Sequence, residues 1–104
     1  MPAREPSGAT VTRVPVTTES TTLLAANTSR RGATIYNGTS ADLDIKYGTG
    51  ASATSRTVRV PSGWSHELPP TAVNASGEIT GCYAGIITGA LSTGTGNVDV
   101  TEVA

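Results

Sequence analysis

Few residues of this chain could act as a nucleophile or a base. It has one histidine, His66, and one cysteine, Cys82. Nucleophilic catalysis needs an activated nucleophile, a base within hydrogen-bonding reach and usually a group that orients the base. His66 lies in an alternating run between Trp64 and Leu68, and Cys82 lies in a glycine-rich apolar run. Both are therefore predicted to be structural side chains, and we expect no enzymatic activity.

Metal and cofactor chemistry has equally little support. A single cysteine excludes cysteine-based zinc sites and an intramolecular disulfide. Asp42 and Asp44 share one face of a predicted strand, but neighbouring Lys46 favours a solvated face over a Ca²⁺ or Mg²⁺ site. The run 48–53 fits the letters of the dinucleotide motif G-x-G-x-x-G/A, yet a predicted strand follows it where the motif requires a helix. We expect no metal and no cofactor.

The composition excludes several other classes of protein. The 104 residues carry 7 basic and 8 acidic side chains, so a nucleic-acid interface, which shows as a basic excess, is not predicted. Serine and threonine together make up 28 residues, and only 14% of the chain is charged. Such a composition disfavours helices and favours strands and turns.

Neither export nor membrane insertion is expected. The first eight residues contain two prolines and two charges and have no apolar segment typical of a secretory signal. The longest apolar stretch, Tyr83 to Leu91, is interrupted by glycine and threonine and is too short to span a bilayer. We expect a protein that is synthesised in a cytoplasm and is not exported by the usual route.

The remaining chain alternates as strands do. In the run Asp42–Tyr47 the pattern places Leu43, Ile45 and Tyr47 inward and the charged residues in water. Pro15 predicts an edge strand or a break in the strand, and Asn37-Gly38 predicts a turn. Thr71 to Gly77 is predicted as a loop. The predicted strands are Thr10–Thr18, Thr21–Ala26, Gly32–Asn37, Asp42–Tyr47, Ser55–Val60, Trp64–Leu68, Glu78–Ala90 (one bent strand or two short ones) and Asn97–Val103.

These patterns predict an all-β protein. We expect an antiparallel β-sandwich or small jelly roll of about seven to nine short strands. One domain covers residues 10–104, and residues 1–9 form an arm that is either a frayed terminus or a segment that orders on a partner. Since the hydrophobic content is only 37%, the core must be thin, and association with another chain would supply further burial.

An ordered set of short motifs is similar to a known group of proteins. The set resembles small β-rich virion proteins that are encoded in the structural gene clusters of tailed bacteriophages. Its members, in chain order, are Asn27–Asn37, Ser40–Gly48, Gly50–Ser55, Val58–Gly63, Glu67–Pro69 and the closing Val100–Glu102.

The resemblance implies a bacteriophage structural protein, foremost a capsid decoration (cement) protein. Such a protein sits on the outer surface of the virion head, often as a trimer, and reinforces contacts between major capsid subunits. The expected partners are thus the major capsid protein and further copies of this chain. For the capsid contact we favour the arm, through Pro2, Arg4, Glu5 and Pro6, and secondarily the turn at Arg30 and Arg31.

A second hypothesis stays open beside the first. The chain could be a carbohydrate- or receptor-binding β module of a head or tail fibre. A sugar-binding module needs exposed aromatic side chains, and Trp64 and Tyr36 are the aromatics that the strand pattern leaves free. This hypothesis predicts an exposed surface that contains both rings.

Overall fold

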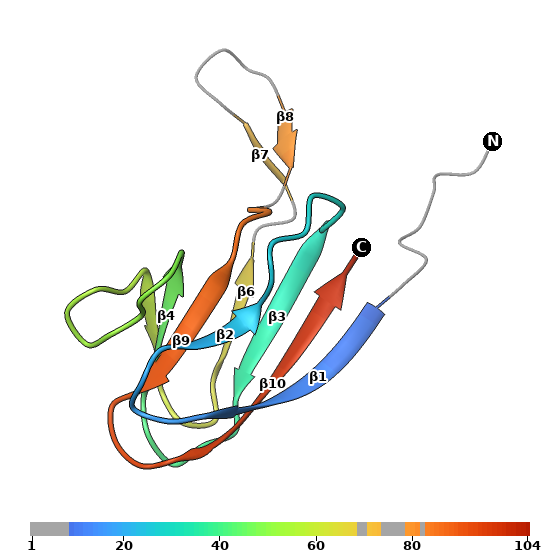
Figure 1. Ribbon diagram of the computed structural model, residues 1–104. Helices are drawn as coiled ribbons and strands as arrows, with labels where there is room; N and C mark the ends of the chain where they lie inside the picture. The colour runs from blue at the N-terminus through green and yellow to red at the C-terminus, as the bar shows by residue number, and fades with distance from the viewer. Residues whose placement is uncertain (1–8, 69–70, 74–78, 82) are drawn as a thin grey trace.

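The computed structural model describes residues 9–68, 71–73, 79–81 and 83–104, and in these ranges it is all-β (Figure 1). Eight strands form two four-stranded antiparallel sheets, and two further strands pair as a separate hairpin. The strands are β1 (Ala9–Val16), β2 (Thr21–Leu24), β3 (Gly32–Asn37), β4 (Leu43–Tyr47), β5 (Val58–Val60), β6 (Ser65–Leu68), β7 (Thr71–Val73), β8 (Ile79–Gly81), β9 (Ile87–Leu91) and β10 (Gly96–Val103). No membrane-crossing helix is found in the described ranges.

The two sheets have the connectivity of a jelly roll. The first sheet has the order β1-β10-β3-β6 and the second the order β2-β9-β4-β5. The pairs β1–β10, β2–β9, β3–β6 and β4–β5 are nested inside one another in the sequence, as in a long hairpin that has been rolled up. The predicted fold class is therefore confirmed.

Some boundaries differ from the prediction. The first strand begins at Ala9, which had been assigned to the arm, because this residue pairs with Val103. Thr71–Val73 is a strand and not a loop, since it pairs with Ile79–Gly81. For residues 78–90, predicted as one bent strand or two short ones, the structure has two short strands, β8 and β9.

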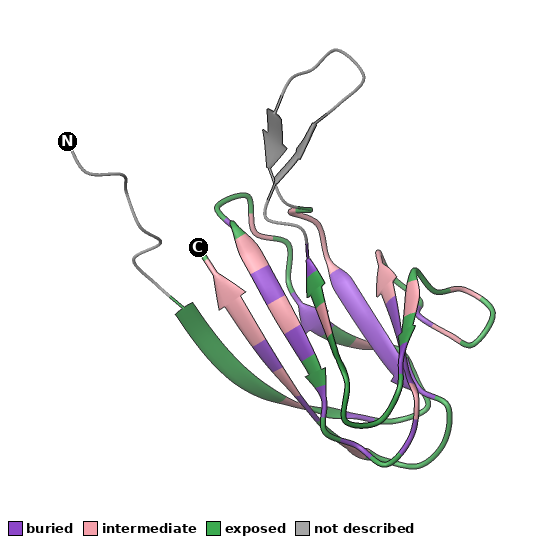
Figure 2. Ribbon diagram, turned by 180° about the vertical axis from the view of Figure 1, so that it is seen from behind, coloured by how far each residue is buried: buried purple, intermediate pink, exposed green. Residues whose placement is uncertain are grey.

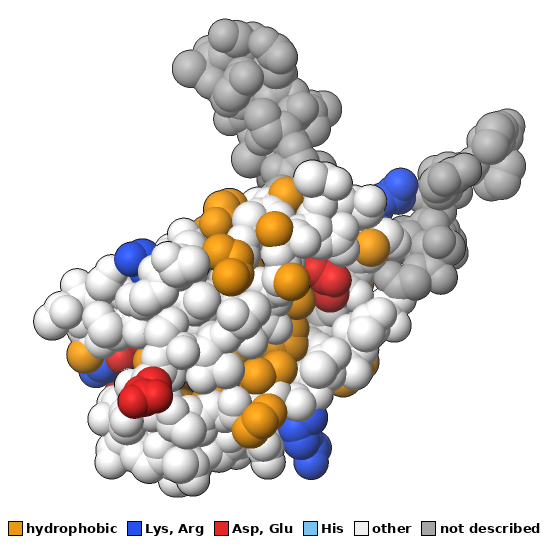
Figure 3. All heavy atoms as spheres, in the orientation of Figure 1, with side chains coloured by type: hydrophobic (Ala, Val, Ile, Leu, Met, Phe, Trp, Pro, Cys, Tyr) orange, Lys and Arg blue, Asp and Glu red, His pale blue; other side chains and the backbone are white. Residues whose placement is uncertain are grey.

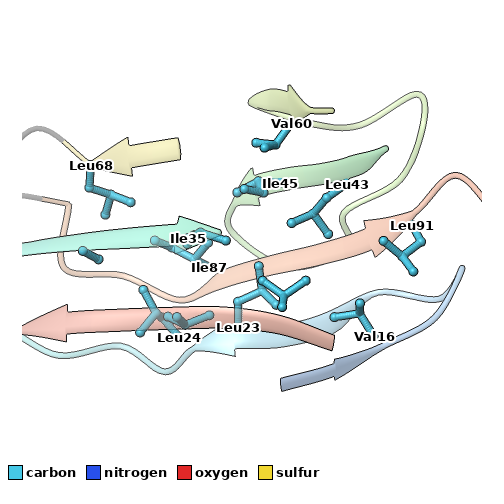
Figure 4. Packing of buried hydrophobic residues seen from close by; sticks show 13 residues of the cluster. Val16, Leu23, Leu24, Ile35, Leu43, Ile45, Val60, Leu68, Ile87 and Leu91 are labelled. Atoms are coloured by element: carbon cyan, nitrogen blue, oxygen red, sulfur yellow. The ribbon is translucent and has the colours of Figure 1, made fainter. Parts of the chain in front are cut away.

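The core lies between the two sheets. In β3 every second residue is buried, and in β10 Val98 and Val100 are buried, while Ile87–Leu91 in β9 is buried on both faces (Figure 2). Side chains from both sheets point toward one another in Figure 4. The cluster consists of Val16, Leu23, Leu24, Ala33, Ile35, Leu43, Ile45, Val60, Leu68, Ile87, Leu91, Val98 and Val100.

The glycine-rich loop after β4 covers the outer face of β9. Thr88 of β9 donates a hydrogen bond through Oγ1 to the carbonyl oxygen of Gly48 at 2.7 Å, and the Ala51 amide donates to Thr88 Oγ1 at 3.2 Å. Gly48 and Gly50 have φ angles of 142° and 78°, which favour glycine. The loop leads into β5, so its resemblance to a dinucleotide motif reflects its turn chemistry.

The predicted exposure of Asp44 is wrong. This residue lies on the outer face of β4, yet its residue surface is only 1% exposed. In the register of the sheet it lies opposite Arg59, whose Nε and Nη2 donate to Asp44 Oδ1 and Oδ2 at 2.7 and 3.1 Å. Arg56 adds a third hydrogen bond at 3.2 Å. Two long cationic side chains therefore cover the carboxylate and satisfy its oxygens.

Candidate functional site

A polar groove lies on the outer face of the first sheet. Arg13 of β1, Asp99 of β10 and Tyr36 of β3 are direct cross-strand neighbours and form one row across three strands. Arg13 Nε donates to Asp99 Oδ1 at 3.1 Å. The Tyr36 residue is 43% exposed, because its neighbour Ile35 takes the core side of β3. The row therefore presents a ring beside an exposed ion pair.

The groove continues from this row to the turns at one end of the sandwich. It has a volume of about 510 Å³. Its lining residues are Arg13, Tyr36, Gly38, Thr39, Ser40, Thr95, Gly96, Asn97 and Asp99.

The buried side chain of Asn37 holds the wall of the groove in place. Its Nδ2 donates to the carbonyl oxygens of Ala41 and Val60 at 2.8 and 2.9 Å. Its Oδ1 accepts hydrogen bonds from Thr39 N at 3.0 Å and from Thr39 Oγ1 at 2.7 Å. The predicted turn at Asn37-Gly38 is thus present, but the Asn37 amide, and not a positive φ, fixes its shape.

One side of the sandwich is open. β1 and β2 are edge strands of their two sheets, and no described strand pairs with their outer edges. Between them lies a furrow of about 200 Å³, lined by Thr10, Thr12, Leu23, Leu24, Ala25, Val100 and Glu102. Figure 3 shows hydrophobic side chains gathered along a furrow on this face. We call the free edges of β1 and β2 together with the furrow the open side.

The opposite side of the sandwich is closed by aromatic side chains. Tyr47 of β4 in the second sheet and His66 of β6 in the first are joined by a hydrogen bond of 2.7 Å between Tyr47 Oη and His66 Nε2. Tyr83 stacks on Tyr47 with ring centroids 5.0 Å apart. Burial lowers the pKa of His66, since an imidazolium is less well solvated there. His66 is therefore placed as a structural residue that links the two sheets.

Of the six residues predicted to contact the capsid, the structure describes only Arg30 and Arg31. Pro2, Arg4, Glu5 and Pro6 lie outside the described residues, as does Cys82. Arg31 is exposed, as a contact residue should be. Arg30, by contrast, has a side chain that is 0% exposed and bonded within the chain, so its guanidinium does not face a partner in this structure.

Tyr36 and Trp64, the two aromatic residues that the strand pattern leaves free, do not belong to one groove. Trp64 is 67% exposed, as expected, but it precedes β6 and is not among the residues that line the Tyr36 groove. Sequence reasoning identified Tyr36 and missed its neighbours Arg13 and Asp99. Tyr36 could be identified because the alternation in β3 places it on the outer face. Arg13 and Asp99 could not, because no local pattern shows that β1, β10 and β3 pair.

The site has no metal-binding arrangement. In the described part of the chain no three histidine, cysteine, aspartate or glutamate side chains gather into a possible metal site. Asp42 and Asp44, considered above as oxygen ligands, instead face Arg59 at 3.8 and 2.7 Å.

No protein-family model, curated protein or solved structure gives a significant match to the chain.

Proposed function

We propose that the protein is a structural component of a bacteriophage virion, a capsid decoration protein that binds the outside of the head and braces contacts between major capsid subunits. The ordered motifs between Asn27 and Pro69 support this role, as does the hydroxyl-rich, weakly charged composition. The jelly roll is a common architecture of viral capsid and lectin domains, although a fold alone does not define a function.

The single observation that carries the proposal is the open side. Val11 is 69% exposed, and Thr10 and Thr12 on the opposite face of β1 are exposed as well, so this half of the strand is uncovered on both faces. An uncovered edge strand can accept a strand of another chain through main-chain hydrogen bonds. The adjacent furrow, with Leu23 and Leu24 in its lining, would receive an apolar side chain of that strand.

The position of Pro15 indicates which backbone groups of β1 are free. Proline cannot donate a ladder hydrogen bond, so in an edge strand its nitrogen points away from the neighbouring strand. Because successive residues of a strand alternate in direction, Val11 shares the orientation of Pro15, and Thr12 has the opposite one. The Val11 amide is thus a free donor at the edge, whereas the Thr12 amide faces β10.

This orientation provides a matched pair of variants. Val11→Pro removes a donor at the free edge and should leave the unfolding midpoint nearly unchanged. It should abolish binding to purified heads that lack the protein, as measured by co-sedimentation. Thr12→Pro removes a donor that faces β10 and should destabilise the fold. Full binding by a folded Val11→Pro variant would exclude the edge of β1 as the capsid contact.

A second measurement tests the virion assignment itself. Quantitative mass spectrometry of gradient-purified particles would compare the copy number of this chain with that of the major capsid protein. A comparable or simple fractional ratio is expected for a protein that covers the lattice, and a trimer in solution would fit local threefold positions. A very low ratio would place the protein at a neck, tail or fibre, and absence from particles would refute the proposal.

A further inference from the structure

The groove at Tyr36 is separate from the open side. It lies on the outer face of the first sheet, whereas a capsid strand would bind at the edge and the furrow. A decoration protein that is bound through its open side would still present this outer face to the surroundings. The groove therefore needs an explanation of its own.

The chemistry of the groove is dense in free hydrogen-bonding groups. Ser40, Thr95 and Asn97 are exposed, and their side chains make no hydrogen bond within the described residues. Arg13 supplies donors, and Asp99 supplies acceptors, because their single 3.1 Å contact leaves the other polar atoms of both groups unused. Donors and acceptors thus surround one exposed aromatic ring, that of Tyr36.

The side chains that line the groove favour one class of ligand over others. A nucleic acid would require an excess of cations, but Asp99 neutralises Arg13. A lipid or an apolar peptide would require several hydrophobic side chains, and Tyr36 is the sole aromatic or aliphatic residue larger than glycine in the lining. A sugar ring has hydroxyl groups around its rim and an apolar face of C–H groups, which matches a single aromatic platform with a polar border.

We propose that this groove is a saccharide-binding site in which one sugar ring stacks on Tyr36. The Arg13–Asp99 pair would hydrogen-bond neighbouring hydroxyl groups, with Arg13 donating and Asp99 accepting. Asn97 and Ser40 would fix the orientation of the ring from the other side. The carbohydrate-binding hypothesis from the sequence named Trp64 and Tyr36. Trp64 lies outside this site, so only Tyr36 would contact the sugar.

The wall of the groove is held rigidly before any ligand arrives. Asn37 fixes Thr39 through two hydrogen bonds, and the methyl group of Thr39 packs against the backbone of Gly96. A Cβ atom at Gly96 would lie 2.6 Å from Thr39 Cγ2, so the close approach of these two turns requires glycine. A preformed wall lowers the entropic cost of binding a small ligand.

The test is an NMR titration of the full-length, ¹⁵N-labelled protein. The probes are the methyl glycosides of glucose, mannose, galactose and N-acetylglucosamine, together with chitotriose. At least one probe should produce saturable shifts in the amide signals of residues 36–40 and 95–99. Tyr36→Ala should weaken that binding about tenfold or more because the stacking platform is removed, while Tyr36→Phe should retain most of it.

A matched control distinguishes binding at the groove from nonspecific sugar binding. Trp64→Ala removes an exposed ring that lies outside the groove lining and should leave the affinity unchanged. The proposal is overturned if none of the probes gives saturable shifts at the groove, if the shifts centre on Trp64, or if Tyr36→Ala binds as the parent protein does. Because no capsid is present in this assay, its failure would not bear on capsid binding, and the reverse also holds.

Discussion

Arg30 Nε lies 2.8 Å from Glu102 Oε2, in an ion pair that joins the turn before β3 to the last strand. The other nitrogens of the same guanidinium donate to three backbone carbonyl oxygens, those of Ala25, Tyr83 and Gly85. One side chain thus ties together the end of β2, the segment before β9 and the C-terminal half of β10. The planar, five-donor group of arginine suits such a buried junction.

Replacement of Arg30 is expected to be strongly destabilising. Arg30→Ala removes the ion pair to Glu102 and the hydrogen bonds that Arg30 donates to three carbonyl groups, which should lower the free energy of unfolding by about 3–5 kcal/mol. Arg31→Ala is the control, because an exposed side chain usually contributes within about 0.5 kcal/mol. Urea denaturation of both variants checks the difference. Equal effects would show that the buried network contributes little.

Asp44 should matter more than Asp42, although the sequence places both carboxylates on the same face of a strand. Asp44→Asn removes the charge that binds Arg59 and Arg56, so the urea midpoint should fall clearly. Asp42 lies 3.8 Å from Arg59 and its side chain is 44% exposed, so Asp42→Asn should leave the midpoint almost unchanged. An Asp44→Asn variant as stable as the parent would refute the role of this cluster.

The strands could be predicted from the sequence because their signal is local. The alternation of Ala33 and Ile35 against Thr34 and Tyr36 specifies a half-buried strand without knowledge of its neighbours. Pro15 similarly predicted an edge strand, and β1 is one. The nesting of the strands depends on which strand pairs with which, and no local pattern specifies it.

The surfaces could not be predicted in the same way. Asp44 reads as a solvated residue because the pattern does not reveal that two arginines, 12 and 15 positions later, fold over it. Arg30 reads as a surface turn residue for the same reason, since its partner Glu102 lies 72 positions away. The groove requires the register of three strands that are distant in the sequence. Each of these errors is an error about long-range contacts.

Two glycines provide a test of core packing. A Cβ atom at Gly89 would lie 2.7 Å from Leu23 Cδ1 and 3.2 Å from Leu43 Cδ1, so Gly89→Ala should cost about 1–3 kcal/mol through overpacking. Gly32 has no atom within 4 Å of an added Cβ, and Gly32→Ala should be neutral or should stabilise by up to about 1 kcal/mol. Thermal unfolding of the two variants should shift in these different directions. A neutral Gly89→Ala would mean that Leu23 and Leu43 can move aside.

The burial of His66 makes stability depend on pH. Burial lowers the pKa of His66 in the folded protein below the ordinary value of 6.5. Below that pH the unfolded chain therefore binds more protons than the folded one, and stability rises with pH in this window. The full contribution is present above pH 6.5 and is progressively lost as the pH falls toward the lowered pKa of the folded state.

Thermal melts between the neutral range and the onset of carboxylate titration would measure this effect. The parent protein should lose stability as the pH falls through this window. His66→Gln is the matched variant, because its amide can donate a hydrogen bond to the Tyr47 hydroxyl group or accept one from it but does not titrate. Its melting temperature should change less over the same window, since the side chain at position 66 then has no proton to bind. An equal slope in both proteins would assign the pH dependence to other groups and leave His66 a packing residue only.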